Sequence, residues 1–156
     1  MNPTIRQATA NDLDDLLRFE QGIVSSEREF DSTLQDGRIH YYDIEQLIRA
    51  PNVHFLVAET AGKLIGCGYA RIDAAKPYLR HSVQGYLGLM YVDPQHRGQS
   101  VNRQIVAALE IWCRSRNVLE LRLEVYRGNI GAIRAYQKAG FSEHMVEMRR
   151  RLTGAA

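Results

Sequence analysis

The chain has 156 residues, of which 45% are hydrophobic and 24% are charged, and its formal net charge is +2. This is the composition of an ordinary globular protein, and it excludes a disordered or fibrous chain. The small net charge argues against a nucleic-acid-binding protein, and no apolar run approaches the roughly 18 residues of a membrane span. We therefore expect residues 1–156 to form one domain in the cytoplasm, with no membrane or nucleic-acid partner.

The first half of the chain predicts short strands and helices in alternation. A capping-box-like segment, Thr9-Ala-Asn-Asp12, should start the first helix. The polar stretch that follows predicts a long irregular connection, of the kind that often carries function. Ala61-Gly62 predicts a tight turn that joins two strands as an antiparallel hairpin. The expected ranges are a strand at 4–8, a helix through about Glu20, a connection at 21–39, a helix at 42–49, and strands at 53–59 and 63–72.

The second half predicts a glycine-containing strand and two further helices. Gly85 and Gly88 lie inside the strand at 84–92 and indicate a bulge or a close approach to its backbone. Residues 119–125 alternate strictly, so the leucines and Val125 should share one strand face. The other expected ranges are a helix at 100–116, a helix capped by Asn129 that runs through Ala139 and ends at Gly140, and one or two closing strands at 141–152.

The charges are unevenly distributed along the chain. Residues 1–50 contain ten acidic and five basic side chains, whereas residues 97–151 contain eleven basic and five acidic ones. This asymmetry would suit a cationic substrate at one side and a polyphosphate ligand at the other. Spare charges on solvated helix faces would explain it equally well.

The two cysteines are predicted to be structural. Cys67 and Cys113 lie far apart in the sequence, and neither has the spacing of a metal site or a redox pair. We therefore expect reduced core thiols and no metal site.

The segment Tyr91-Val-Asp-Pro-Gln-His-Arg-Gly-Gln-Ser100 predicts an anion cradle. A strand that runs through a glycine turn into a helix leaves several backbone N–H groups directed at one place, where a phosphate would satisfy them. Gly98 allows close approach of the backbone, and Arg97 adds a positive charge. An ordinary strand-turn-helix joint would give the same pattern.

Two segments, Val92-Asp-Pro-Gln-His-Arg-Gly-Gln-Ser100 and Asn129-Ile-Gly-Ala-Ile-Arg-Ala-Tyr-Gln-Lys-Ala-Gly-Phe141, resemble the signatures of the GNAT superfamily of acetyl-CoA-dependent N-acetyltransferases. Two positions depart from the family pattern: Ser100 replaces the usual Gly or Ala, and Asn102 stands where a further Gly is common. The resemblance implies an α/β fold whose central mixed, mostly antiparallel sheet carries a V-shaped splay between its fourth and fifth strands, flanked by about four helices.

The resemblance also implies where acetyl-CoA binds. The cosubstrate would lie in the splay, with its pantetheine arm along the fourth strand and its pyrophosphate on the amides of Arg97 through Val101. The family pattern needs no metal. The implied contacts are Met90, Tyr91, Val92, Gln95, His96, Arg97, Gly98, Gln99, Ser100, Val101, Asn102, Asn129, Ala132, Tyr136 and Lys138.

Acetyl transfer to an amine needs a base for the amine and a proton for the departing thiolate. Tyr136 resembles the family tyrosine that protonates the sulfur, although a core aromatic would look the same. Glu124 is the expected base because it precedes Tyr136 by the interval found in the ribosomal-protein alanine acetyltransferases. A strand carboxylate paired with an arginine is the alternative. Glu27, Glu29 and Tyr86 remain as further substrate-binding or proton-accepting candidates.

The function predicted from these residues is acetyl transfer from acetyl-CoA to a primary amine of a small molecule or peptide, and the sequence leaves open whether the protein acts as a monomer or a homodimer. A non-catalytic acyl-CoA-binding regulatory module is the alternative, because the glycine turn is altered. The connection at 21–39 is expected to recognise the acceptor, and fold resemblance alone does not name that acceptor.

Overall fold

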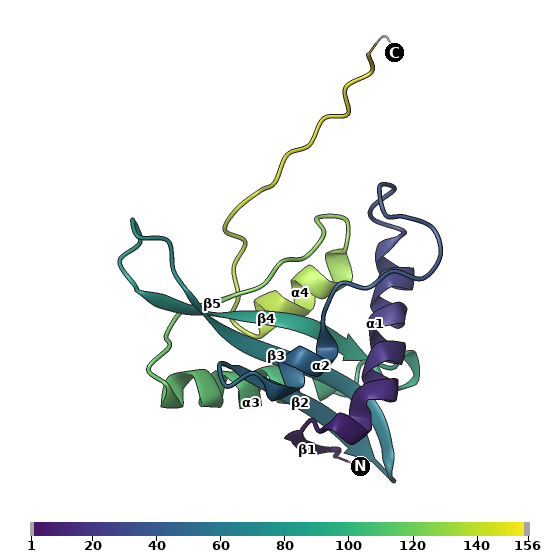
Figure 1. Cartoon of the computed structure of the whole chain (residues 1–156), viewed down its shortest axis with the longest axis vertical. Coiled ribbons are helices and arrows are strands. Elements are labelled where there is room, and N and C mark those ends of the chain that lie inside the picture. Colours follow the sequence, from purple (N-terminus) through teal and green to yellow (C-terminus); the bar gives the residue numbers. More distant parts are fainter. Residues whose placement is uncertain (1, 155–156) are drawn as a thin grey trace.

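The computed structural model describes residues 2–154, and its centre is one five-stranded sheet (Figure 1). The strand order is β1-β2-β3-β4-β5, with antiparallel pairing except between β4 and β5, which are parallel. This confirms the expected mixed, mostly antiparallel sheet. The elements are β1 (Thr4–Gln7), η1 (Ala10–Asp12), α1 (Leu13–Glu27), α2 (Ile44–Arg49), β2 (Val53–Thr60), β3 (Lys63–Ala74), β4 (Val83–Val92), η2 (Pro94–His96), α3 (Val101–Ser115), β5 (Leu121–Arg122) and α4 (Ile130–Lys138).

Helices cover both faces of the sheet, so the core has two layers. On one face α1 and α2 pack against the strands through Phe19, Leu47 and the fully buried Tyr69. On the other face α3 packs through Ile105 and Leu109. β2 and β3 are buried along most of their length, so their side chains contribute to both layers, as expected for strands buried on two sides. Cys67 and Cys113 are free and buried, as predicted.

The first helix is longer than predicted. It continues to Glu27 instead of ending near Glu20, so the irregular connection spans only residues 28–43. Gly22, in the segment predicted to be irregular, lies inside α1, where an added Cβ would come within 2.8 Å of the Tyr91 ring. That glycine allows close packing of α1 on β4. Val24 is fully buried and continues the apolar face of the helix past the glycine.

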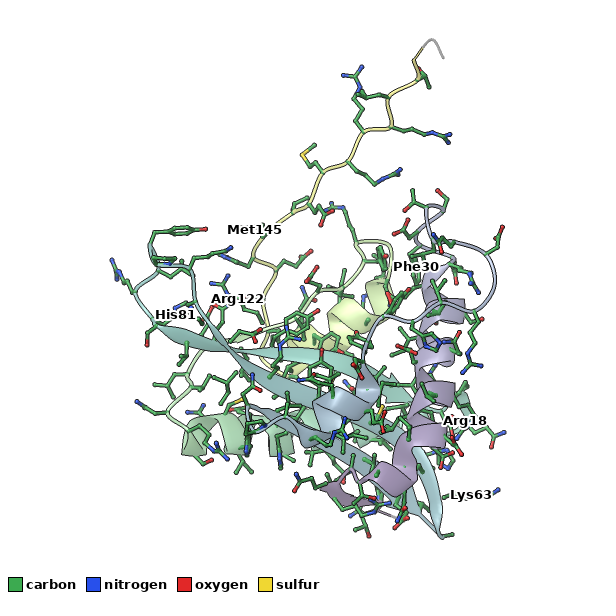
Figure 2. All side chains as sticks on the ribbon, viewed as in Figure 1. Arg18, Phe30, Lys63, His81, Arg122 and Met145 are labelled. Carbon is green, nitrogen blue, oxygen red and sulfur yellow. The ribbon has the colours of Figure 1, made fainter. Side chains whose placement is uncertain are left out.

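The expected strands at the end of the chain are wrong in extent. β5 has only two residues, Leu119 is 73% exposed, and residues 141–154 form no strand and leave the body of the protein near β5 (Figures 1 and 2). Because no strand lies on the outer edge of β5, the alternating segment 119–125 is held on one side only. Met145 lies on the departing segment and is 82% exposed.

The splay between β4 and β5 is confirmed. The two strands pair only at Gly85 with Leu121 and at Tyr86 with Arg122, and β4 then continues to Val92 paired with β3 alone. A register shift in the pairing of β4 with β3 falls between Gly88 and Tyr91, and Leu89 has a φ of +46°. The predicted bulge therefore lies one residue beyond Gly88. It turns the backbone of β4 at the point where the splay opens.

Within residues 2–154, no helix is both long enough and apolar enough to cross a membrane.

Candidate active site

The anion cradle is formed where β4 passes through η2 into α3. Gly98 has a φ of +77°, and a Cβ built there would meet no protein atom within 4 Å. The positive φ favours glycine at position 98. The absence of a side chain there leaves open space beside the turn. Ser100 caps α3 without a side-chain hydrogen bond to the first turn, so the opening amides of this 15-residue helix keep their donors available. Such a turn can hold an anionic group.

Two side chains of the cradle, Arg97 and Gln99, donate hydrogen bonds to backbone carbonyl groups of the same segment. The Arg97 Nε donates to the carbonyl oxygen of Val92 at 3.1 Å, so its guanidinium folds back over the end of β4. The Gln99 amide donates to the carbonyl oxygen of Gln95 at 3.3 Å. His96 has a buried Nδ1 without a hydrogen-bond partner among the described residues. Any anion at this turn would thus meet the backbone amides of 98–101 first, with the Arg97 charge nearby.

Ser100 adopts the left-handed conformation, with φ 65° and ψ 17°. A residue with a Cβ pays about 1 kcal/mol or more for this conformation, which glycine adopts freely. We expect Ser100→Gly to raise the free energy of unfolding by about 1 kcal/mol and to keep the cradle intact. Urea unfolding of the free protein measures the change. Ser26→Gly, the same change at an exposed right-handed position of α1, should lower the free energy of unfolding. An equal loss of stability in the two variants would contradict the left-handed conformation of Ser100.

Tyr136 lies on α4, which begins as predicted. The Asn129 side chain accepts from the backbone N–H of Ala132 at 3.2 Å, and Gly140 ends the helix with a φ of +99°. The Tyr136 ring meets Phe141 edge-on, with the ring centroids 5.8 Å apart. Burial, and then the charge of the nearby Tyr42, raise the pKa of Tyr136 to about 12. The phenol is therefore protonated at neutral pH and has a proton to give.

Glu124 follows β5 and is exposed. Its Oε1 accepts a long hydrogen bond, 3.5 Å, from the hydroxyl of Tyr86 on β4. Burial, and then the negative charge of Glu124, raise the pKa of Tyr86 to about 12. Two predicted residues thus meet across the base of the splay. In the described part of the chain no hydrogen bond joins Glu124 to Tyr136.

Glu27 lies at the end of α1, on the other side of the site. Its side chain is half-buried, and its pKa is raised, first by burial and then by the charge of Asp31. Glu29 is exposed. Hydrogen bonds from Thr33 and Tyr126 lower the pKa of Asp31 to about 2.

Two residues missed by the sequence reasoning tie the connection to the far side of the splay. The Tyr126 hydroxyl donates to Asp31 Oδ2 at 2.7 Å, and its ring stacks on Phe30 with the centroids 6.4 Å apart. Asp31 and Tyr126 are 95 residues apart in the sequence, and no pattern announces their contact. The connection 28–43 therefore borders the splay next to the segment between β5 and α4.

Glu20 was also missed, although a signal for it existed. Leu16, Phe19 and Val24 define the apolar face of α1, and Glu20 falls on that face by helical spacing. Its side chain is 0% exposed. A carboxylate in such a position must have hydrogen-bond partners, and it accepts from the backbone N–H groups of Tyr41 and Tyr42.

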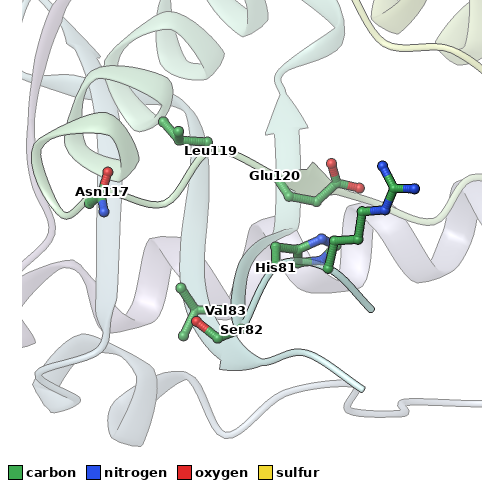
Figure 3. A pocket seen from close by; sticks show the side chains of 7 residues that line it. His81, Ser82, Val83, Asn117, Leu119 and Glu120 are labelled. Atoms are coloured by element: carbon green, nitrogen blue, oxygen red, sulfur yellow. The ribbon is translucent and has the colours of Figure 1, made fainter. Parts of the chain in front are cut away.

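The pocket in Figure 3 is a separate feature. It has a volume of about 340 Å³ and lies where β4 begins, whereas the cradle lies where β4 ends. No predicted site residue lines it; its lining residues are Arg80, His81, Ser82, Val83, Asn117, Leu119 and Glu120. Among residues 2–154, no group of three or more His, Cys, Asp or Glu side chains is placed to hold a metal ion.

Several known proteins are similar to this chain in sequence or in fold. The chain is 31% identical over 104 residues to an IAA acetyltransferase of Azospirillum brasilense, a match covering 67% of this chain and 63% of that protein. It is 28% identical over 144 residues to an aminoglycoside N(6')-acetyltransferase type 1 of Stenotrophomonas maltophilia, covering 90% and 87%. In structure it resembles the BH1408 protein of Bacillus halodurans, with a TM-score of 0.86 and 18% identity over 96% of this chain and 99% of that one.

The match to a family covers more of the chain than either signature segment. Residues 13–141 match the model of the family described as "Acetyltransferase (GNAT) family". This range begins with α1 and ends just after α4. The range includes the cradle, the splay and Tyr136. The chain belongs to the GNAT acetyltransferase family.

Proposed function

We propose that this protein is an N-acetyltransferase that moves the acetyl group of acetyl-CoA to a primary amine of a small molecule or peptide by direct attack. The observation that carries the proposal is the splay of β4 from β5, with an amide-rich turn at the end of β4 and a protonated tyrosine on α4. Family membership supports it. The matched Stenotrophomonas maltophilia protein is named for transfer to a nitrogen of an aminoglycoside.

The cosubstrate would bind along β4 and at the cradle. The open space at Gly98 and the uncapped first turn of α3 fit a pyrophosphate, which needs several donors and close backbone approach. Beyond Tyr86, the edge of β4 that faces away from β3 is not paired with β5 and can hydrogen-bond an extended pantetheine arm, with Met90, Tyr91 and Val92 along it. The remaining proposed contacts are Gln95, His96, Arg97, Gln99, Ser100, Val101, Asn102, Asn129, Ala132, Tyr136 and Lys138.

In the proposed reaction Tyr136 is the general acid. It gives its proton to the sulfur as the carbon–sulfur bond breaks, and its raised pKa keeps that proton in place at neutral pH until then.

Glu124 is proposed as the base that takes the amine proton, directly or through Tyr86, because the two side chains are in contact at the base of the splay. Glu27 is the alternative. Its half-buried carboxylate has a raised pKa, which would make it a better proton acceptor near neutral pH than an ordinary glutamate.

We propose that the acceptor enters as a cation beside the connection 28–43. Asp31 remains ionised far below neutral pH, and Glu27 lies close enough for the two carboxylates to repel each other. An ammonium group would relieve that repulsion. Tyr126 and Phe30 provide aromatic surface next to these charges, where a cation is also attracted to the ring faces.

The cellular setting is proposed from the sequence expectations. Residues 1–156 would act as one domain, since a single sheet carries both core layers. Two free thiols suit the reducing cytoplasm. A homodimer remains a proposal, which sedimentation would test.

Release of CoA from acetyl-CoA with a panel of amines tests the proposed function. The panel should pair each primary amine with its N-acetylated or alcohol analogue, and mass spectrometry should identify the acetylated product. We expect turnover only with the primary amines. Binding of acetyl-CoA without turnover of any amine would favour the non-catalytic alternative.

The same assay assigns the base when it is run across pH. Glu124→Gln should lower kcat/KM most near neutral pH, and turnover should recover in part as pH rises and free amine becomes abundant. Glu27→Gln should instead raise KM for cationic amines. If the two variants exchanged these behaviours, Glu27 would be the base and Glu124 a binding residue. Glu45→Gln, at an exposed position of α2, is the matched control.

A further inference from the structure

The starting point is the buried carboxylate of Glu20, which holds one short piece of the connection before α2. Its Oε2 accepts from the backbone N–H groups of Tyr41 at 2.9 Å and Tyr42 at 3.0 Å, and its Oε1 lies 2.8 Å from the Nδ1 of His40. All three partners are consecutive residues. Because a buried carboxylate is costly without such partners, α1 fixes the position of this piece of chain.

Tyr42 is directed from this fixed piece toward β4. Its ring meets the fully buried Tyr69 edge-on, with the centroids 5.8 Å apart and the planes at 85°. The backbone N–H of Leu89 donates to the Tyr42 hydroxyl oxygen at 3.4 Å. Burial raises the pKa of Tyr42, so the hydroxyl keeps its proton. The oxygen is thus held as an acceptor while its own O–H group remains available as a donor.

The place where this hydroxyl lies is the opening of the splay. Leu89 is the bulge residue with positive φ, three residues beyond the last pairing of β4 with β5. Tyr42 and Tyr86 both pack against the core cluster that contains Tyr69 and Leu89, so the phenols of the connection and of β4 lie at this end of the splay. The charge of Tyr42 also contributes to the raised pKa of Tyr136 on α4. If Tyr136 protonates the sulfur, the thioester carbonyl must lie in the same region.

We propose that the Tyr42 hydroxyl is a catalytic hydrogen-bond donor to the carbonyl oxygen of the thioester. This rests on the proposed function. As the amine nitrogen bonds to the carbonyl carbon, negative charge builds on that oxygen, where a fixed donor stabilises it. The carbonyl re-forms when the carbon–sulfur bond breaks; the base receives the amine proton, Tyr136 supplies the sulfur with one, and Tyr42 retains its own.

The Leu89 N–H contact adds to this role. A hydroxyl that accepts a hydrogen bond becomes a better donor, because chains of hydrogen bonds polarise one another. The bulge thus anchors the phenol and strengthens it. Glu20 is a positioning residue in this scheme, since it acts only by fixing the backbone of Tyr42.

Tyr42→Phe tests the proposal, with Tyr41→Phe as the matched control. The neighbouring Tyr41 hydroxyl is buried but has no hydrogen-bond partner in the described structure. Phenylalanine keeps the packing of Tyr42 on Tyr69, so the fold and acetyl-CoA affinity should persist. We expect kcat to fall about 100-fold in Tyr42→Phe, as for loss of one donor to a developing oxyanion, with KM for the amine unchanged. Tyr41→Phe should behave as wild type.

A spectroscopic measurement separates this role from a structural one. In the binary complex with acetyl-CoA labelled with ¹³C at the carbonyl, the carbonyl infrared band should lie at lower frequency in the wild type and in Tyr41→Phe than in Tyr42→Phe. An unchanged band in Tyr42→Phe, or a fall in kcat explained by weaker acetyl-CoA binding or a lower melting temperature, would overturn the proposal. The binary complex contains no amine, so failure to acetylate any amine would count against the proposed function and leave this readout intact.

Discussion

Replacing Gly98 by Glu is expected to weaken acetyl-CoA binding by about 10- to 100-fold, since one charge pair at about 4 Å is worth roughly 1 kcal/mol in water and 4 kcal/mol near a protein surface. The new carboxylate would stand at the turn whose amides are proposed to bind the pyrophosphate. Nothing in the protein fills the space beside Gly98, so the added side chain would extend into the ligand's place rather than into the core. Isothermal titration calorimetry with acetyl-CoA measures the loss.

Gly62→Glu is the control for backbone strain. Gly62 has a φ of +75°, close to the +77° of Gly98, and it too has no protein atom within 4 Å of a built Cβ, but it lies in the turn between β2 and β3. The two substitutions should cost similar stability, and only the change at Gly98 should weaken acetyl-CoA. Equal acetyl-CoA affinity in the two variants would show that the cradle does not bind acetyl-CoA.

Tyr136→Phe is expected to lower kcat by about 100-fold, at the low end of what general acid catalysis contributes, because a thiolate is already a good leaving group. The ring packs edge-on against Phe141, and phenylalanine retains that contact. Acetyl-CoA affinity should therefore change little, since the substitution removes one hydroxyl. Steady-state kinetics and calorimetry on the same preparation separate the two effects.

The pH profile gives a second test of Tyr136. The raised pKa of about 12 means that the wild type should not lose its acid until far above neutral pH, so turnover should not decline between pH 7 and pH 9. Tyr78→Phe, at an 81% exposed tyrosine, controls for the loss of a hydroxyl elsewhere. Wild-type kcat in Tyr136→Phe would show that the thiolate leaves without help from this residue.

Local patterns in the sequence carried enough information for most of the fold. The hairpin turn at Ala61-Gly62, the Asn129 cap and the Gly140 terminus depend on residues close together in the chain, and all three are present. The glycine turn before α3 is also local. Such features follow from backbone conformation and capping chemistry, which single residues determine.

The errors arose where distant residues decide the structure. Gly22 lies in a helix whose packing leaves no room for a Cβ beside the Tyr91 ring, and the sequence near Gly22 contains no sign of that contact. The alternating segment 119–125 predicted a long strand, but β5 has a partner on one side only and pairs for two residues. Alternation sets which face a side chain takes, whereas the length of a strand depends on its neighbours.

The candidate site divides in the same way. Tyr136, Glu124 and the cradle were found from motifs, whereas Asp31, Tyr126 and Tyr42 reach the site through contacts between segments far apart in sequence. Glu20 could be predicted only in part. A glutamate on the apolar face of a predicted helix indicates a buried carboxylate with partners, but not which residues those partners are.

The proposed binding of acetyl-CoA in the splay, with its pyrophosphate on the amides that open α3, is open to direct observation. Titration of ¹⁵N-labelled protein with acetyl-CoA, followed by amide chemical shifts, tests it most directly. We expect the largest shifts at Gly98, Gln99, Ser100 and Val101, with a second group on β4 from Leu89 to Val92. Shifts confined to the pocket lined by His81 and Asn117, with the cradle amides unmoved, would contradict it.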